Sequence, residues 1–181
     1  VHLTETLTEW HRTHPLAPGA PRRALHAGLA AGLTPPAYDA LIAHLCVKGI
    51  LAASGPTVRL ADFQIHLDET QSAAREAMAA ELKSAGLEGS KFDDLIQQTD
   101  GLLQLLLDGD EALRIGDRVV WKDHLTQLKS DIRTFFAHNQ RLTPGDFKDL
   151  TGQSRRTAIP LLEWLDSAGI TRRDGDARVA G

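Results

Sequence analysis

Residues 153–179, QSRRTAIPLLEWLDSAGITRRDGDARV, decide the fold. Apolar residues recur there at helical spacing and predict a helix over about 153–168, with the buried stripe Ala158, Leu161, Leu162 and Leu165. Gly169 ends this helix, and Gly175 then lies between two short strand-like runs, which is the signature of a β-hairpin. The stretch therefore predicts a helix that leads directly into a two-stranded hairpin.

The same pattern occurs three times along the chain, at a spacing near 60 residues. In each repeat one glycine ends a helix and a second lies in the hairpin turn: Gly49 and Gly55, Gly109 and Gly116, Gly169 and Gly175. The helices are predicted over 35–48, 100–108 and 153–168, and the hairpins over 51–60, 112–121 and 170–179.

Each repeat also opens with an apolar helical pattern and a second short helix. Three helices followed by a hairpin is the winged-helix plan, a helix-turn-helix with a wing. We therefore predict a mainly α fold with small antiparallel β-hairpins, arranged as tandem winged-helix domains at residues 1–66, 67–124 and 125–181. An array of plain three-helix bundles is the alternative, and the repeated glycine-centred hairpins speak against it.

Local signals refine the last repeat. Thr143 and Ser154 are placed to cap its second and third helices, and Pro144 fits the first helical position. Pro160 lies inside the third helix and should bend it or tighten its first turns, because proline removes one backbone hydrogen bond. Bends between the repeats are expected near residues 61–70 and 122–126.

Composition limits the class of protein. The chain has 181 residues, 42% of them hydrophobic, and lacks a run of the roughly 20 apolar residues that would span a membrane. Its single cysteine, Cys46, cannot form an internal disulfide, which fits a reducing, cytoplasmic compartment. Because the sequence has neither a signal-peptide pattern nor a long dimerisation helix, we expect a monomer without a membrane partner.

Charge is distributed unevenly along the chain. The net charge is −4, but residues 125–181 hold nine Lys and Arg against seven Asp and Glu, whereas the rest hold eleven against seventeen. Screening limits electrostatic attraction to about 8 Å in physiological salt. Any contact with phosphate should therefore be confined to the C-terminal third.

Five of the seven arginines in that third lie in two clusters. Arg155 and Arg156 stand near a predicted helix N-terminus, where a phosphate or a base edge could use both free N–H groups and guanidinium forks. Arg172, Arg173 and Arg178 lie on the predicted hairpin, and strand alternation puts Arg172 and Arg173 on opposite faces. The alternative is pairing with neighbouring carboxylates, although exposed pairs contribute only ~0–1 kcal/mol each. Those carboxylates are Glu163, Asp166, Asp174 and Asp176.

Little in the sequence indicates catalysis. His11 and His14 lie three residues apart without a third ligand nearby, so we expect surface histidines and no metal site. Cys46 shares a helix face with Ile42 and Leu45 and is predicted to pack in a core. We expect no enzyme activity, no catalytic residues and no bound cofactor in this chain.

Residues 147–179 closely resemble the end of bacterial SelB, the family of selenocysteine-specific elongation factors. Arg156 stands where the family usually has Lys, and Trp164 where Tyr is common, so a charge is kept and a hydroxyl is lost. The first repeat is similar over 14–21 and 23–25, and the middle repeat only by its architecture. The motifs are Phe147, Thr151-Gly-Gln-Ser-Arg-Arg156, Ile159-Pro-Leu-Leu-Glu-Trp-Leu-Asp166 and Thr171-Arg-Arg-Asp-Gly-Asp-Ala-Arg178.

The resemblance implies a factor with a GTPase half and four C-terminal winged helices, of which this chain would hold the second, third and fourth. The chain has no Gly-x-x-x-x-Gly-Lys-Ser/Thr phosphate loop, so we expect the GTPase, with its GTP and Mg²⁺, to lie outside it. We interpret the chain as a fragment cut near a module boundary. The implied partner is an mRNA hairpin, the selenocysteine insertion element beside a UGA codon. The ribosome and selenocysteinyl-tRNA would be reached through the full-length factor.

The resemblance also implies where RNA would bind. An A-form stem hides its base edges in a deep, narrow groove, so sequence-specific proteins grip its backbone and bind unstacked bases from loops or bulges. Backbone contact is expected at the start of the last unit's third helix and on its second helix, and phosphate or stacking contact on the hairpin. The predicted RNA-binding residues are Arg141, Lys148, Ser154, Arg155, Arg156, Arg172, Arg173 and Arg178.

Two other functional classes stay open from the sequence. In a DNA-binding winged-helix regulator, the same third helix would enter a major groove. In a protein-interaction array, the acidic first two domains would bind partner proteins. A gel-shift comparison of hairpin RNA with duplex DNA would separate the first class from an RNA-binding protein.

Overall fold

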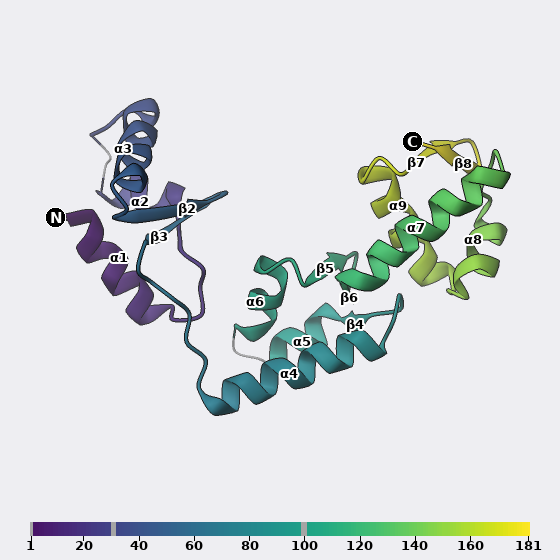
Figure 1. Ribbon diagram of the computed structural model, residues 1–181, viewed down its shortest axis with the longest axis horizontal. Helices are drawn as coiled ribbons and strands as arrows, with labels where there is room; N and C mark the ends of the chain where they lie inside the picture. Colours follow the sequence, from purple (N-terminus) through teal and green to yellow (C-terminus); the bar gives the residue numbers. More distant parts are fainter. Residues whose placement is uncertain (1, 30–31, 99–100) are drawn as a thin grey trace. The chain divides into compact units, whose positions relative to one another are not determined.

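The computed structural model describes residues 2–29, 32–98 and 101–181. The chain divides into two compact units, residues 1–72 and 73–181. Helices dominate and the sheets are small and antiparallel, which confirms the predicted fold class (Figure 1). Residue 100, the predicted start of one third helix, lies outside the described residues.

The first unit holds a segment that we call the first module, residues 2–60. Its core is built from Leu7, Ile42 and Val58, which come from the first helix, the third helix and the last strand. The strands form one sheet in the order β1-β3-β2. Its elements are α1 (His2–Thr13), β1 (Ala20–Pro21), α2 (Arg22–Leu29), α3 (Pro35–Val47), β2 (Leu51–Ser54) and β3 (Thr57–Leu60).

His11 is buried in the first module, so its prediction as a surface histidine is wrong. Its ring stacks on Phe63 with centroids 3.6 Å apart, and its Nε2 accepts a hydrogen bond from the backbone N–H of Leu60 at 3.3 Å. Burial, with a smaller contribution from the charge of Arg59, lowers the pKa of His11. His14 is exposed, as predicted.

Two further sets of helices and a hairpin follow, which we call the middle module (residues 69–121) and the last module (residues 122–180); all but the first four residues of the middle module belong to the second unit. The middle module has α4 (Glu69–Ser84), β4 (Ser90–Lys91), α5 (Phe92–Gln98), α6 (Leu102–Asp108), β5 (Ala112–Ile115) and β6 (Arg118–Trp121). The last module has α7 (Lys122–His138), α8 (Pro144–Thr151), α9 (Arg155–Ser167), β7 (Thr171–Asp174) and β8 (Ala177–Ala180).

All three predicted hairpins are present, but the sequence prediction missed β1 and β4. Each is only two residues long and pairs with the last strand of its module, β1 with β3 and β4 with β6. The last module has instead an isolated bridge between Leu142 and Arg178. Segments this short give no periodic signal in a sequence.

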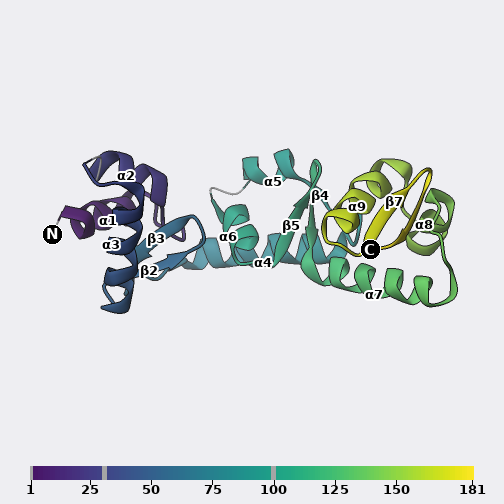
Figure 2. The ribbon, with the colours of Figure 1, turned by 90° about the horizontal axis from the view of Figure 1, so that it is seen from above.

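No bend occurs at residues 122–126, so that prediction is wrong. α7 begins at Lys122, directly after β6, and runs unbroken to His138 (Figure 2). Leu125 is 1% exposed and belongs to the same buried cluster as Ile115 and Val120 of the β5–β6 hairpin. The boundary predicted at 124 and 125 thus falls inside a helix. The threefold division and the bend near 61–70 stay predictions.

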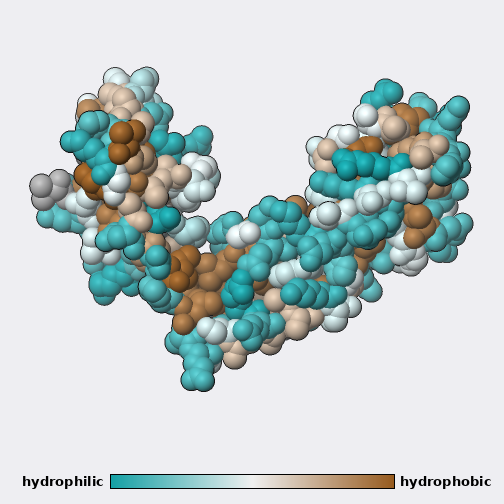
Figure 3. Space-filling model, in the orientation of Figure 1, coloured by the Kyte–Doolittle hydropathy of each residue, from teal (hydrophilic) through white to brown (hydrophobic). Residues whose placement is uncertain are grey.

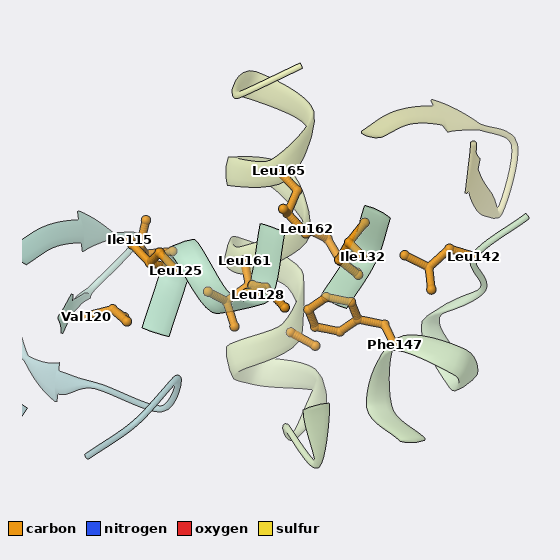
Figure 4. Close-up of a cluster of buried hydrophobic side chains, with 11 residues drawn as sticks. Ile115, Val120, Leu125, Leu128, Ile132, Leu142, Phe147, Leu161, Leu162 and Leu165 are labelled. Carbon is orange, nitrogen blue, oxygen red and sulfur yellow. The ribbon is translucent and has the colours of Figure 1, made fainter. Parts of the chain in front are cut away.

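One apolar cluster connects the middle and last modules. Leu128 and Leu161 lie next to each other between α7 and α9, and the ring of Phe147 from α8 points toward them (Figure 4). The predicted stripe of α9 lies in this cluster and is buried throughout: Ala158, Leu161, Leu162 and Leu165. The core therefore fixes the orientation of α9.

Candidate nucleic-acid interface

The start of α8 is fixed by reciprocal capping, as the sequence predicts. The backbone N–H of Asp146 donates to Thr143 Oγ1 at 3.2 Å, and the N–H of Thr143 donates to Asp146 Oδ2 at 2.8 Å. The hydrogen bonds from Thr143 lower the pKa of Asp146. This cap sets the position of Lys148, one turn further along the helix and exposed.

The start of α9 is left open. Ser154 occupies the N-cap position, but its side chain makes no capping hydrogen bond to the backbone and instead lies 3.5 Å from Thr157 Oγ1. Ser154 thus occupies the predicted N-cap position, but the predicted hydrogen bond from its side chain to the helix backbone is absent. Arg155 and Arg156 follow, both exposed, on the first turn.

The hairpin separates its arginines by face. Arg173 pairs with Arg178 across the strands, and Arg172 pairs with Val179. Because directly opposed residues share a face and neighbours along a strand alternate, Arg173 and Arg178 lie on one face and Arg172 on the other. The predicted separation of Arg172 from Arg173 is confirmed.

Arg178 anchors the hairpin to α9. Its Nε donates to both carboxylate oxygens of Asp166, at 3.2 and 3.1 Å, and its side chain is only 11% exposed. The Thr171 hydroxyl donates to the same carboxylate. Arg178 thus has the structural role that the pairing alternative describes, and its contact with RNA stays a prediction.

Two other predicted residues have carboxylate partners. Arg141 Nη2 lies 3.4 Å from Asp174 Oδ2, within the last module. Arg156 Nη2 lies 3.1 Å from Asp117 Oδ2, in the turn of the β5–β6 hairpin. Within the described residues, three of the predicted arginines therefore have carboxylate partners, but only the pair of Arg178 with Asp166 is one that the sequence alternative named.

A surface groove of about 670 Å³ lies between α8, α9 and the β7–β8 hairpin. Its cationic lining consists of Lys148, Arg155, Arg173 and Arg178. Among the residues that the structure describes, the first three have no carboxylate within ion-pair distance. The remaining lining residues are Pro144, Gly145, Gln153, Ala158, Ile159, Leu162, Glu163 and Asp176.

The groove therefore combines an apolar floor with a cationic rim. Ile159 also lines the groove and is 44% exposed, although it lies between Ala158 and Leu161 of the buried stripe. Glu163 and Asp176 also line the groove and limit its positive charge. Figure 3 shows hydrophobic and hydrophilic residues mixed over the C-terminal part of the chain. Sequence reasoning missed Gln153 and Ile159, although a large apolar residue outside the buried stripe was a usable signal.

The groove does not include every predicted residue. Arg141, Ser154, Arg156 and Arg172 are exposed but are absent from its lining. Arg155 thus lines the groove, whereas Arg156 lies beside the middle module and contacts Asp117.

Within the described ranges, no group of three or more His, Cys, Asp or Glu residues could hold a metal ion. Cys46 packs against the first module's core, as predicted, and Trp164 packs against the core of the last module. None of the described helices has the length and apolar character needed to cross a membrane.

Comparison with known proteins identifies relatives of this chain. Two family models described as "Elongation factor SelB, winged helix" match residues 4–60 and 134–180. A selenocysteine-specific elongation factor from Desulfomicrobium baculatum is 30% identical over 186 residues, which cover 96% of this chain and 29% of that protein. The chain thus spans less than a third of that relative.

Two solved structures resemble it. The mRNA-binding domain of elongation factor SelB from E. coli, in complex with SECIS RNA, is 26% identical, with a TM-score of 0.51 over 63% of this chain and 98% of that one. A bacterial selenocysteine-specific elongation factor, EF-Sec, is 16% identical, with a TM-score of 0.56 over 99% of this chain and 29% of that one, a likeness of fold alone.

The repeated winged-helix elements, the two family matches and the relative that spans nearly the whole chain agree: the chain belongs to the SelB family and corresponds to its C-terminal winged-helix part.

Proposed function

We propose that this chain binds a hairpin in messenger RNA, the selenocysteine insertion element, through the groove of its last module. The observation that carries the proposal is the set of three cations without carboxylate partners, Lys148, Arg155 and Arg173, around an apolar floor. Phosphates would contact the rim, and an unstacked base would find apolar contact with Ile159. The RNA complex of the E. coli relative supports RNA over duplex DNA and over a partner protein.

The binding role would serve the whole factor. Delivery of selenocysteinyl-tRNA to the ribosome at a UGA codon, with GTP and Mg²⁺, would be carried out by parts of the factor outside this chain. The described residues would contribute recognition and no catalytic step. Arg141, Ser154, Arg156, Arg172 and Arg178 remain proposed RNA contacts of the surrounding surface.

The test is a pair of matched substitutions in the whole chain. Arg155→Ala removes a rim cation and should weaken binding of a selenocysteine insertion hairpin about tenfold, the scale of one charge-assisted hydrogen bond. Arg133→Ala removes an exposed arginine of α7 that does not line the groove, and it should leave the dissociation constant unchanged. Equal constants for both variants in a filter-binding assay would exclude the groove as the site.

Salt dependence gives a second readout. With about four phosphates contacted, log K should fall with log salt at a slope of roughly −3 to −4. Duplex DNA of equal length serves as the competitor. Binding that is independent of salt, or that prefers the duplex, would contradict the proposal.

A further inference from the structure

Arg156 is the predicted RNA contact whose carboxylate partner comes from the middle module. Its Nη2 lies 3.1 Å from Asp117 Oδ2, whereas the partners of Arg141 and Arg178 belong to the last module itself. Asp117 follows Gly116 in the turn between β5 and β6. The middle module thus places a negative charge beside the first turn of α9.

The packing around this turn holds Asp117 in place. Gly116 has a φ of +62°, and a Cβ atom built there would lie 3.3 Å from Cβ of Pro160, so the turn backbone lies directly against α9. Ile115, next to the turn, and Val120, further along β6, are buried in the same cluster as Leu161. The cavity left between the hairpin and α9 is about 10 Å³, which is at most room for one water.

The pair itself is weak enough to be exchanged. Arg156 and Asp117 are 69% and 59% exposed, and exposed ion pairs contribute only ~0–1 kcal/mol. A phosphate offers the guanidinium two parallel hydrogen bonds, so it can replace a single carboxylate contact. The hydrogen bond from Arg156 lowers the pKa of Asp117, so this carboxylate is fully ionised at neutral pH and repels an approaching phosphate.

We propose that Asp117, a residue of the middle module, limits the RNA affinity of the last module by competing with phosphate for Arg156. This inference rests on the proposed RNA-binding function and extends its site beyond the groove. The contact between the two modules would then have a role in binding: the packing of Gly116 on Pro160 keeps the Asp117 carboxylate within reach of Arg156. Bound RNA would exchange the Asp117 contact for one to its backbone.

The test is Asp117→Asn in the whole chain, measured with the same hairpin RNA at several salt concentrations. The variant should bind about two- to fivefold more tightly, the range set by an exposed ion pair. Its log–log salt slope should steepen by up to about 0.7–0.9, because the variant gains an Arg156–phosphate pair without giving up the Asp117 pair. Asp117→Glu keeps the charge and should behave like the unaltered chain. Equal urea midpoints would show that each variant is folded.

Asp110→Asn is the matched control. It makes the same change of charge in the same module and frees Lys122 from its ion pair, but Lys122 lies at the start of α7 and not on α9. Its affinity and salt slope should stay unchanged. Adding Arg156→Ala to Asp117→Asn should abolish the gain in affinity.

Three results would overturn the inference: an Asp117→Asn variant that binds like the unaltered chain, a gain shared by Asp110→Asn, or a gain that survives Arg156→Ala. In each case the unaltered chain still binds RNA, so the proposed function stands. Absence of RNA binding by the unaltered chain would overturn both proposals together.

Discussion

The β5–β6 and β7–β8 hairpins have the same backbone turn, but their arginines contact different neighbours. Both turn at a glycine, Gly116 and Gly175, and in both an arginine two residues earlier donates its Nε to the carbonyl of that glycine at 3.2 Å. In the middle module, Arg114 lies 3.8 Å over the ring of Phe92. In the last module, Arg173 lines the groove without an aromatic or carboxylate partner in the described chain.

The strands that flank the two turns differ in burial as well. Ile115 and Val120 of the middle hairpin are buried in the shared core, whereas Asp174 is exposed and Val179 is half-buried at the corresponding positions of the last hairpin. The middle wing therefore packs between modules, whereas the same backbone in the last module leaves the cationic face with Arg173 open to a ligand.

The largest expected effect concerns the buried hairpin. Val120→Asp places an unpaired carboxylate in a core position that is 1% exposed, and it should reduce the free energy of unfolding of the second unit by about 4 kcal/mol. Val179→Asp makes the same change at the equivalent, half-buried position and should cost less than about 1 kcal/mol. Urea titration measures both, and similar losses would remove the distinction between the two hairpins.

A smaller effect is expected where the last hairpin is anchored. Val119 of β6 is fully buried, but the equivalent residue of β8 is Arg178, which is held by Asp166. Asp166→Ala leaves this arginine with no partner in a mostly buried position and should cost about 2 kcal/mol, since Asp166 is itself partly exposed. Asp149→Ala, an exposed carboxylate of the same module, is the control. Equal urea midpoints for the two variants would contradict the anchoring role.

The two equivalent arginines allow a direct test of the open face. Arg173→Ala should weaken binding of the hairpin RNA about five- to tenfold, because it removes one rim cation. Arg114→Ala is the matched control, because it removes the equivalent arginine of the β5–β6 hairpin, which stacks on Phe92. It should leave the dissociation constant unchanged. If both substitutions weaken binding equally, RNA contacts the middle module too.

The β2–β3 hairpin of the first module gives the smallest expected effect. His11 is neutral when its Nε2 accepts the hydrogen bond from Leu60, and its folded-state pKa is lowered. The contribution of neutral His11 to the free energy of unfolding is therefore complete above the unfolded pKa of about 6.5. It is lost as the pH falls through the lower pKa of the folded state. Thermal unfolding of the first unit at pH 7 and pH 5 should show a loss of about 1 kcal/mol, the scale of one hydrogen bond. His11→Asn should reduce that pH dependence; an unaltered dependence would implicate other groups.

Local patterns predicted much of this molecule. The hairpin glycines, the Thr143 cap and the stripe of α9 all follow from spacing over a few residues, and the structure has them where they were expected. Of the groove, Lys148, Arg155 and Arg173 could be named from the sequence because charge accumulates near a helix start and a hairpin.

Long-range pairs could not be predicted in the same way. The partner of Arg156 lies 39 residues earlier in the chain, in another module, and the ring that covers His11 lies on the segment after β3. The first turn of α7 is held because Leu125 packs with Ile115 and Val120 in one buried cluster. Helical periodicity in the sequence does not predict that contact. Such contacts depend on how the modules pack, and packing between modules produces no periodic pattern in the sequence.

Titration of the whole chain with the hairpin RNA, followed by NMR of its backbone amides, tests the central claim most directly. We predict the largest shifts around the groove, from residues 144–159 and 173–178, and only small shifts in residues 2–60. Shifts centred on the first module, or spread evenly over the chain, would contradict the assignment of RNA binding to the groove of the last module.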